Sequence, residues 1–307
     1  MRRVPAAAAA CVVFLSSADS LRTHADAVQA PRALIVSVDG LRGDLILDAD
    51  VPHLRGLMAR GAYTLDARTI ETPYTVPAHV SMLTGALPEK HGVTWNDHIE
   101  GAYPEVPTLF ELARRAGHTT ALVAGKTKLV VLTKPGTLNW SHVGHEGYER
   151  DADIARRAAG FIRSHRPQLM FVHLGDVDAI GHEAGWRSGP QLRAVEAADH
   201  AIGDLLEQLS ASGLSGHTTV IVTADHGGSG DQHLPDDPLS RQVPWIVAGP
   251  CIRSHVDIGA PASGKVSILA TFTVISALFD LDDAEHTNSD ARDYRDEVYI
   301  GGCEPGS

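Results

Sequence analysis

The sequence predicts an α/β fold in which a mostly parallel central sheet carries helices on both faces. Three observations lead to this fold class. Short apolar runs alternate with longer amphipathic runs along most of the chain, a pattern that is typical of βαβ units. The first apolar run, residues 33–38, is continuous, as expected for a strand with both faces buried. The length of 307 residues suits one large α/β domain.

The elements follow in order along the chain. Continuous apolar runs predict strands at residues 33–38, 119–124, 168–174, 218–223 and 244–248. Apolar residues at helical spacing predict helices at residues 51–60, 78–84, 108–116, 151–165, 191–209 and 265–279. Residues 126–147 have mixed polarity and contain the turn signal Pro135-Gly136. We expect a loop or a small cap there.

The first 27 residues have the features of a secretory signal peptide. Arg2 and Arg3 form a basic start, residues 5–15 are apolar and rich in alanine, and Ala25-Asp26-Ala27 fits a cleavage site. An anchor helix is the alternative, but the apolar run is short for a bilayer. We expect residues 28–307 to form a single periplasmic or secreted domain. No later segment is long and apolar enough to span a membrane.

The formal charge is −12, and it becomes −13 when residues 1–27 are removed. An acidic chain gains nothing from bulk electrostatics when it meets a nucleic-acid duplex or an anionic lipid surface. Two cysteines remain in the mature chain, Cys251 and Cys303. In an oxidising compartment they could form a disulfide. A buried thiol plus a separate tail thiol fits the sequence equally well.

Three of the predicted strands lead into carboxylate or imidazole groups. Asp39 follows residues 33–38, Asp178 and His182 follow residues 168–174, and Asp225-His226 follows residues 218–223. The carboxyl ends of strands in an open α/β sheet converge on one crevice. Oxygen and nitrogen ligands gathered at one point suit a zinc-type cation. The sequence therefore predicts a metal site at this edge of the sheet.

Thr75 lies between the first two of these elements. Pro77 suits the first turn of a helix, which places Thr75 just before a helix N-terminus, where free amides favour an anion. A hydroxyl beside a metal there can be deprotonated and attack phosphorus. On spacing alone, an ordinary threonine N-cap is the simpler interpretation.

Five segments in this order resemble the type I phosphodiesterase/nucleotide pyrophosphatase branch of the alkaline phosphatase superfamily. They are Val36-Ser37-Val38-Asp39-Gly40, Thr75-Val76-Pro77-Ala78-His79, Thr84-Gly85-Ala86-Leu87-Pro88-Glu89-Lys90-His91-Gly92, Asp178-Ala179-Ile180-Gly181-His182 and Asp225-His226-Gly227. The resemblance covers roughly residues 33–250 and is to short members of the family. It implies an alkaline-phosphatase-like fold and two divalent metals, usually zinc. Asp39, Thr75, Asp225 and His226 would surround one metal, and Asp178, His182 and a third histidine would hold the other.

We assign the third histidine to His233. The short members place it soon after the Asp-His pair and before the next strand, and the glycine-rich loop at residues 227–232 lets the backbone fold back. His255 and His286 are the other candidates. His255 lies beyond the strand at residues 244–248, and His286 lies in the polar tail.

Other residues near these motifs receive smaller roles. Asn96 matches the family residue that hydrogen-bonds a nonbridging phosphoryl oxygen, with a turn asparagine as the alternative. His79 and His91 match family positions, and we expect them to pack the nucleophile loop. Asp176 is out of register with the ligands, so we expect it beside them or exposed. Lys126 could reach a phosphate, but a solvated loop lysine is the preferred interpretation.

The predicted function is a two-metal hydrolase of a small phosphorylated substrate. Three carboxylates and three imidazoles without cysteine suit Zn²⁺, with Mn²⁺ or Fe as alternatives. Thr75 would attack phosphorus and form a covalent intermediate. A phospho-group transferase and a sulfate or phosphonate ester hydrolase remain open, although Thr75-Val76-Pro77-Ala78-His79 lacks the Cys/Ser and the Arg of a formylglycine sulfatase. A metal-stabilised binding protein is the non-enzymatic alternative.

Overall fold

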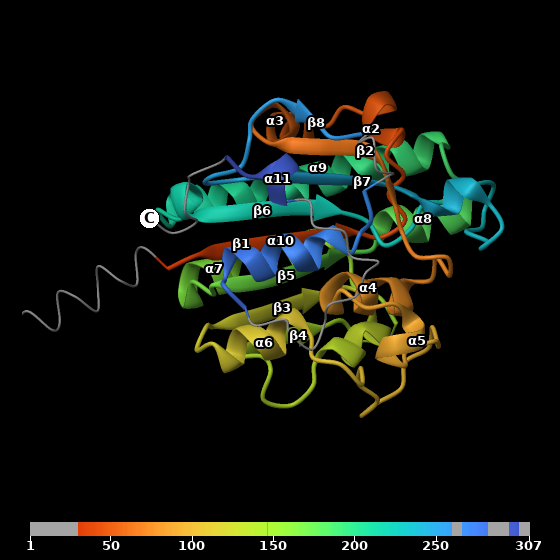
Figure 1. Ribbon diagram of the computed structural model, residues 1–307. Coiled ribbons are helices and arrows are strands. Elements are labelled where there is room, and N and C mark those ends of the chain that lie inside the picture. Colours follow the sequence, from red (N-terminus) through yellow and green to blue (C-terminus); the bar gives the residue numbers. More distant parts are fainter. Residues whose placement is uncertain (1–29, 146, 260–265, 282–294, 301–307) are drawn as a thin grey trace, which may run out of the picture.

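The computed structural model describes residues 30–145, 147–259, 266–281 and 295–300. Its centre is an eight-stranded sheet in the order β4-β3-β5-β1-β6-β7-β2-β8 (Figure 1). In chain order the strands are β1 (Arg32–Val38), β2 (Ala62–Arg68), β3 (Thr120–Ala124), β4 (Trp140–Val143), β5 (Leu169–Leu174), β6 (Thr218–Thr223), β7 (Gln242–Ala248) and β8 (Val256–Asp257). The α/β fold class is confirmed.

Most of the sheet is parallel. Strands β4, β3, β5, β1 and β6 run in one direction, and β7 is antiparallel to both of its neighbours, β6 and β2. In the central register Val38 pairs with Leu174, and Ser37 pairs with Thr223. The carboxyl ends of β1, β5 and β6 therefore lie together at one edge of the sheet. The segments that follow them begin at a common point.

Helices cover both faces of the sheet, as predicted (Figure 1). On one face, α7 (Asp151–His165) and α3 (Pro52–Ala59) both pack against the long helix α9 (Gly189–Ala211). On the other face, α10 (Ala270–Leu278) packs against α4 (Thr75–Thr84) and α6 (Leu109–Arg115). The short helices are α2 (Leu45–Asp48), α5 (Pro88–His91), α8 (Asp176–Ala184) and α11 (Arg295–Val298), with 3₁₀ turns η1 (Thr127–Leu132), η2 (Ser215–His217) and η3 (Pro238–Arg241).

The strongly periodic segments match their predicted bounds, whereas the weakly patterned ones do not. Residues 151–165 and 218–223 form α7 and β6 with the predicted limits. The expectation of a loop or small cap at residues 126–147 needs correction, because the segment contains η1 and the edge strand β4. The four residues of β4 are half-buried or exposed, so an edge strand of this kind carries no apolar signal.

Strand β2 and helix α8 were not predicted. Strand β2 is antiparallel to β7, and its register shifts between Thr64 and Ala67, which breaks the two-residue alternation. Within the described ranges, no helix is long and apolar enough to cross a membrane. The proposed signal peptide (residues 1–27), Cys303 and His286 lie outside the described residues.

Candidate active site

Asp39 stands directly after β1, at the edge where β1, β5 and β6 end. Its carboxylate is fully buried. Oδ2 accepts a hydrogen bond from His173 Nε2 at 2.9 Å and lies 2.7 Å from Lys126 Nζ. The next residue, Gly40, has φ of 74°, and a Cβ there would stand 2.9 Å from the Cα of Asp178. Glycine at this position allows the end of β1 to approach α8 closely.

Asp178 and His182 lie one turn apart on α8, so both side chains share a face of that helix. His182 Nε2 is 3.3 Å from Asp178 Oδ1. Together with His233, these two residues place three potential ligand atoms within 4.8 Å of one another. The structure thus brings all three predicted ligands of one metal together.

Two of the imidazoles in this group are oriented by backbone carbonyls. His182 Nδ1 donates to the carbonyl of Asp231 at 2.8 Å, and His233 Nδ1 donates to the carbonyl of Pro73 at 2.9 Å. A proton held on Nδ1 leaves Nε2 as the free lone pair, which is the usual arrangement of a metal-binding histidine. The fold therefore presents both rings in the tautomer that a cation needs.

Asp225 and His226 follow β6 and are fully buried. Asp225 Oδ1 accepts from the amides of Gly40 and His226, at 3.2 and 3.0 Å. His226 Nε2 lies 3.3 Å from Asp39 Oδ1, 3.4 Å from Asp225 Oδ2 and 3.8 Å from Asp178 Oδ1. Asp39, Asp178 and His226 form a second group with ligand atoms within 4.8 Å of one another.

Four buried polar atoms at this point lack a hydrogen-bond partner among the described residues. They are Asp39 Oδ1, Asp178 Oδ1, Asp225 Oδ2 and His226 Nε2. Buried polar groups are normally satisfied, and an unpaired carboxylate oxygen in the interior is costly. The donor set of three carboxylates and three imidazoles fits two divalent cations, and these four atoms are the ones that such cations would satisfy.

The electrostatics of the site reflect this concentration of charge. Burial alone would raise the pKa of Asp39, but Lys126 and His173 hold it well below its usual range. Burial lowers the pKa of His226, yet the charges of Asp225 and Asp39 outweigh burial and raise that pKa to about 9. Burial and the adjacent His226 lower the pKa of His233 to about 4. The carboxylates here favour a positive charge among them.

Thr75 is the first residue of α4, which begins three residues before its predicted start at residue 78, and it is 1% exposed. Its carbonyl accepts a hydrogen bond from His79 Nδ1 at 2.7 Å, and His79 Nε2 contacts Ser37 Oγ at 2.8 Å. His79 thus ties the start of α4 to β1, in line with the packing role expected for it. The hydroxyl of Thr75 lies 3.5 Å from Lys126 Nζ, which places it beside the ligand groups.

Asn96 is fixed to the residue that follows Thr75. Its Oδ1 accepts from the amide of Val76 at 3.0 Å and from Lys128 Nζ at 3.1 Å. Both bonds use Oδ1, so the amide nitrogen remains as a hydrogen-bond donor. The side chain lies beside the predicted nucleophile, where the expected contact with a phosphoryl oxygen requires it.

The expectation for Lys126 is wrong. Its side chain is 12% exposed and bridges Asp39 and Asp178, with Nζ 2.7 and 2.5 Å from their Oδ2 atoms. The position of Lys126 in a weakly patterned segment suggested that its side chain is solvated, but the chain returns to the sheet edge directly after β3.

Asp176, which was expected either beside the ligands or exposed, is buried. Its Oδ1 accepts from the amide of Asp151 at 3.2 Å, and Asp151 Oδ1 accepts from the amide of Asp176 at 3.1 Å.

Two contributors were missed entirely. His173 is a lone histidine in the apolar strand β5, one residue before its end, and that polar interruption was a usable signal. Lys128 gave no signal, because only the fold shows that η1 reaches Asn96.

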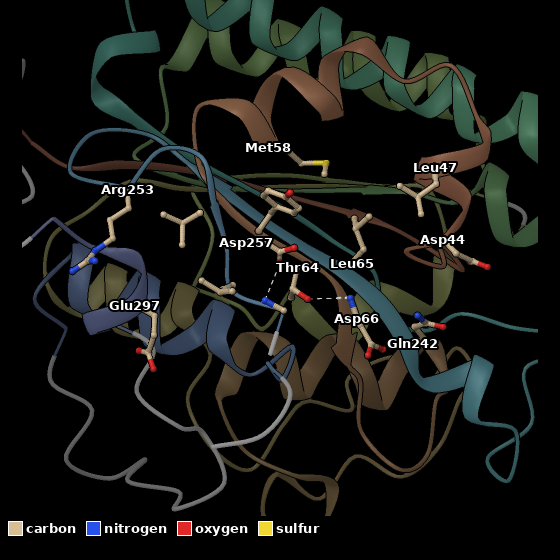
Figure 2. A pocket seen from close by; sticks show the side chains of 14 residues that line it. Asp44, Leu47, Met58, Thr64, Leu65, Asp66, Gln242, Arg253, Asp257 and Glu297 are labelled. Atoms are coloured by element: carbon tan, nitrogen blue, oxygen red, sulfur yellow. Dashed lines mark hydrogen bonds between the residues drawn. The ribbon is translucent and has the colours of Figure 1, made fainter. Parts of the chain in front are cut away.

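A large pocket lies elsewhere on the molecule. It has a volume of about 1060 Å³ and lies along β2 and β8 (Figure 2). Tyr63, Thr64, Asp257 and Arg253 are among its lining residues, and none of its described lining residues is a predicted site residue. The ligand chemistry instead points to the sheet edge near α4 and α8 (Figure 1).

The chain is similar to known proteins in sequence. The family model described as type I phosphodiesterase / nucleotide pyrophosphatase matches residues 33–233, and a sulfatase model matches residues 187–281. The chain is 27% identical over 216 residues to bis(5'-adenosyl)-triphosphatase enpp4 of Mus musculus, covering 64% of this chain and 47% of that protein. It is 23% identical over 213 residues to ectonucleotide pyrophosphatase/phosphodiesterase family member 5 of Homo sapiens, covering 64% of this chain and 44% of that protein. The chain spans about half the length of these relatives.

Solved structures share the fold. Murine ectonucleotide pyrophosphatase/phosphodiesterase 5, described as inactive (T72A) and in complex with AMP, superposes with a TM-score of 0.71 at 16% identity. The match covers 87% of this chain and 100% of that one. A putative sulfatase from Bacteroides fragilis gives a TM-score of 0.65 at 14% identity, covering 90% and 79% of the two chains. With its family model matched over residues 33–233, the chain belongs to the type I phosphodiesterase/nucleotide pyrophosphatase family.

Proposed function

We propose that this chain is a two-metal hydrolase of phosphoric esters, with Thr75 as its nucleophile. The observation that carries the proposal is the convergence of Asp39, Asp178, Asp225 and His226, each with a buried polar atom that lacks a partner among the described residues. A site built to bind a neutral ligand would not gather three buried carboxylates, each with an oxygen that lacks a hydrogen-bond partner among the described residues, beside a buried hydroxyl. Relatives of this family named as triphosphatases and pyrophosphatases support phosphorus as the attacked centre.

Two groups would hold the metals. His182 and His233, with Asp178, would bind one cation, and Asp39, Asp225 and His226, with Thr75, would bind the other. Zn²⁺ suits this donor set, and Mn²⁺ or Fe would also fit. When bound, the cations would lower the pKa of the Thr75 hydroxyl and of a water molecule, and would offset charge on the leaving oxygen.

The chain's own residues supply the remaining steps. The Thr75 hydroxyl loses its proton to solvent and Oγ1 attacks phosphorus, so an O–P bond forms to Thr75 as the ester O–P bond breaks; the displaced oxyanion takes a proton from solvent and leaves as the alcohol. Water then attacks the phosphorus of the threonine ester, the O–P bond to Thr75 breaks, the product phosphate leaves, and Oγ1 takes up a proton that the water releases. The Asn96 amide nitrogen, which is not used in the bonds to Val76 and Lys128, stabilises a nonbridging oxygen. Because Thr75 is 1% exposed, bulk water has little access to the nucleophile.

The test is substitution of the nucleophile. In protein loaded with Zn²⁺, Thr75→Ala should lower turnover of p-nitrophenyl phosphate and bis-p-nitrophenyl phosphate by roughly 10⁴-fold or more. Metal content and the unfolding midpoint should stay near those of the wild type. Thr75→Ser, which keeps a hydroxyl, should retain measurable activity. The proposal would be overturned if Thr75→Ala turned over either ester at the rate of the wild type, or if the Zn²⁺-loaded wild type turned over neither ester.

A sulfate ester hydrolase is the second candidate, because a sulfatase model matches residues 187–281. The nucleophile position argues against it, since Thr75 cannot become a formylglycine. Parallel assays with p-nitrophenyl sulfate decide between the two. Faster hydrolysis of the sulfate than of either phosphate ester would favour the second candidate. Metal binding without turnover of any of the three esters would favour a binding protein.

We further propose that residues 1–27 are a signal peptide and that the mature chain is periplasmic or secreted. The basic start and the short apolar run support this. N-terminal sequencing of exported protein should begin near Val28. An exported chain that retains Met1 would contradict it.

A further inference from the structure

Two lysines from one short segment reach the nucleophile from the side of β3. Lys126 immediately precedes η1, and Lys128 lies within it. Lys126 Nζ is 3.5 Å from Thr75 Oγ1, and Lys128 Nζ is 3.1 Å from Asn96 Oδ1. Since Asn96 is bonded to the amide of Val76, both ammonium groups border the first turn of α4.

The two lysines differ in how they are neutralised. Lys126 pairs with Asp39 and Asp178. Within the described ranges, Lys128 forms no ion pair, and its partner is the neutral amide oxygen of Asn96. The Lys128 side chain is half-buried, and burial followed by repulsion from Lys126 lowers its pKa. A half-buried ammonium without a carboxylate is costly, so an anion from outside the protein would complete its environment.

The charge balance of the site indicates which anion. The three carboxylates of Asp39, Asp178 and Asp225, with the alkoxide of Thr75, would offset the charge of two divalent cations. Lys126 and Lys128 then remain as surplus positive charge beside the phosphoryl position. A diester brings a single negative charge, whereas a phosphate monoester brings close to two at neutral pH.

We propose that Lys128, together with Lys126, selects substrates that carry a second negative charge at the attacked end. This inference rests on the proposed function and narrows its substrate class. The second charge could be that of a monoester phosphoryl group or that of the neighbouring phosphate in a pyrophosphate. Simple diesters, which have neither, are the disfavoured class. Lys128 is the residue to test, because Lys126 also contacts Asp39 and Asp178, and its substitution would disturb the proposed metal ligands.

The experiment compares two charge-removing substitutions in Zn²⁺-loaded protein. Lys128→Gln removes the proposed contact, and Lys134→Gln is the matched control, since Lys134 follows the same segment but pairs with Glu111. Three substrates separate the sources of charge: p-nitrophenyl phosphate, ADP-ribose and bis-p-nitrophenyl phosphate. Loss of a charge-assisted hydrogen bond should cost roughly 10- to 100-fold.

In Lys128→Gln, kcat/KM should fall by at least about 10-fold more for one doubly charged substrate than for the diester. The substrate with the larger loss identifies the source of the second charge. Lys134→Gln should change all three by less than about 2-fold. Lys128→Arg, which keeps the charge, should recover most of the lost selectivity. Equal losses on all three substrates, or no loss on any, would overturn the inference.

A binding measurement keeps the inference independent of turnover. Titration calorimetry with inorganic phosphate should give a Kd about 10-fold weaker for loaded Lys128→Gln than for the wild type, at equal metal content. An unchanged Kd would count against the role of Lys128. If the loaded wild type turns over no ester, the proposed function fails, and the phosphate titration still decides whether Lys128 binds a dianion.

Discussion

His233 shows how one side chain can join two ligand groups. Its ring stacks on that of His226, with centroids 3.8 Å apart and an interplanar angle of 15°. It also shares a potential metal site with Asp178 and His182. His255 lies elsewhere, between two residues that line the pocket along β2 and β8. The ring of His233 therefore contacts residues of both proposed ligand groups.

We predict that His233→Ala removes one metal per chain and lowers turnover by roughly 100-fold or more. The loss follows because the neighbouring His182 and Asp178 cannot complete a tetrahedral site alone. Elemental analysis and steady-state assays measure both effects. His255→Ala is the control and should retain full metal content. The assignment is wrong if His255→Ala loses metal and His233→Ala does not.

His91 gives a prediction about pH. The ring is buried, Nδ1 accepts from the amide of Val93 at 3.1 Å, and Nε2 contacts Ser81 Oγ at 3.0 Å. Burial lowers the pKa of His91 to about 4. The unfolded chain, with a histidine pKa near ~6.5, therefore binds the proton more readily than the folded chain. Stability should fall as the pH drops from about 6.5 towards 4.

Between pH 7.5 and pH 5, His91 should contribute a loss of roughly 2 kcal/mol in the free energy of unfolding. Urea unfolding at the two pH values measures this loss, and a chelator in every sample removes any contribution from pH-dependent metal binding. His91→Gln should be less stable at pH 7.5 but should show a smaller drop on acidification. His98→Gln, at an exposed position, should keep the wild-type drop. An unchanged drop in His91→Gln would contradict this assignment.

At the scale of elements, the turn after β1 sets the distance between two ligand-bearing segments. Gly40 allows that turn to contact α8 at Asp178, which is one of the two predicted metal ligands on that helix. Gly101 has a similar φ of 76° but no atom within 4 Å of an added Cβ. A substitution at Gly101 therefore measures the cost of backbone strain alone, and the same substitution at Gly40 adds the steric contact with Asp178.

We predict that Gly40→Ala destabilises the protein by roughly 3 kcal/mol and weakens metal binding, because Asp178 must shift. Gly101→Ala should cost only about 1 kcal/mol, the cost of the left-handed backbone alone. Thermal unfolding of both variants, with and without metal, provides the comparison. Equal destabilisation in the two would show that the contact with Asp178 does not matter.

At the scale of the whole molecule, the ligands come from segments far apart in sequence. Asp39, Asp178 and Asp225 follow three neighbouring strands, and a bound cation would cross-link them. The sequence predicted these positions because parallel strands end at one edge. It did not predict Lys126, since a lysine in a weakly patterned loop has no local signal of burial. Strand β4 was missed for the same reason, because pairing with β3, rather than its own residues, makes it a strand.

Metal removal tests this cross-linking. Loaded protein should contain close to two metals per chain, and chelation should lower the free energy of unfolding by roughly 3 kcal/mol or more, because the cations bind only the folded state. Calorimetry with and without a chelator measures the shift. Asp178→Asn, which removes a ligand of one proposed cation, should show a smaller shift than the wild type. A midpoint that survives complete removal would contradict the role of the metals in stability.

The two outermost strands of the sheet have a consequence for solubility at high concentration. Strand β4 has four residues and β8 has two, and they stand at opposite ends of the strand order. An edge strand this short exposes few backbone groups in register to a neighbouring molecule. Edge-to-edge stacking of sheets is the route by which many β-rich proteins aggregate. Because both edge strands of this sheet are short, we expect little edge-to-edge pairing between molecules.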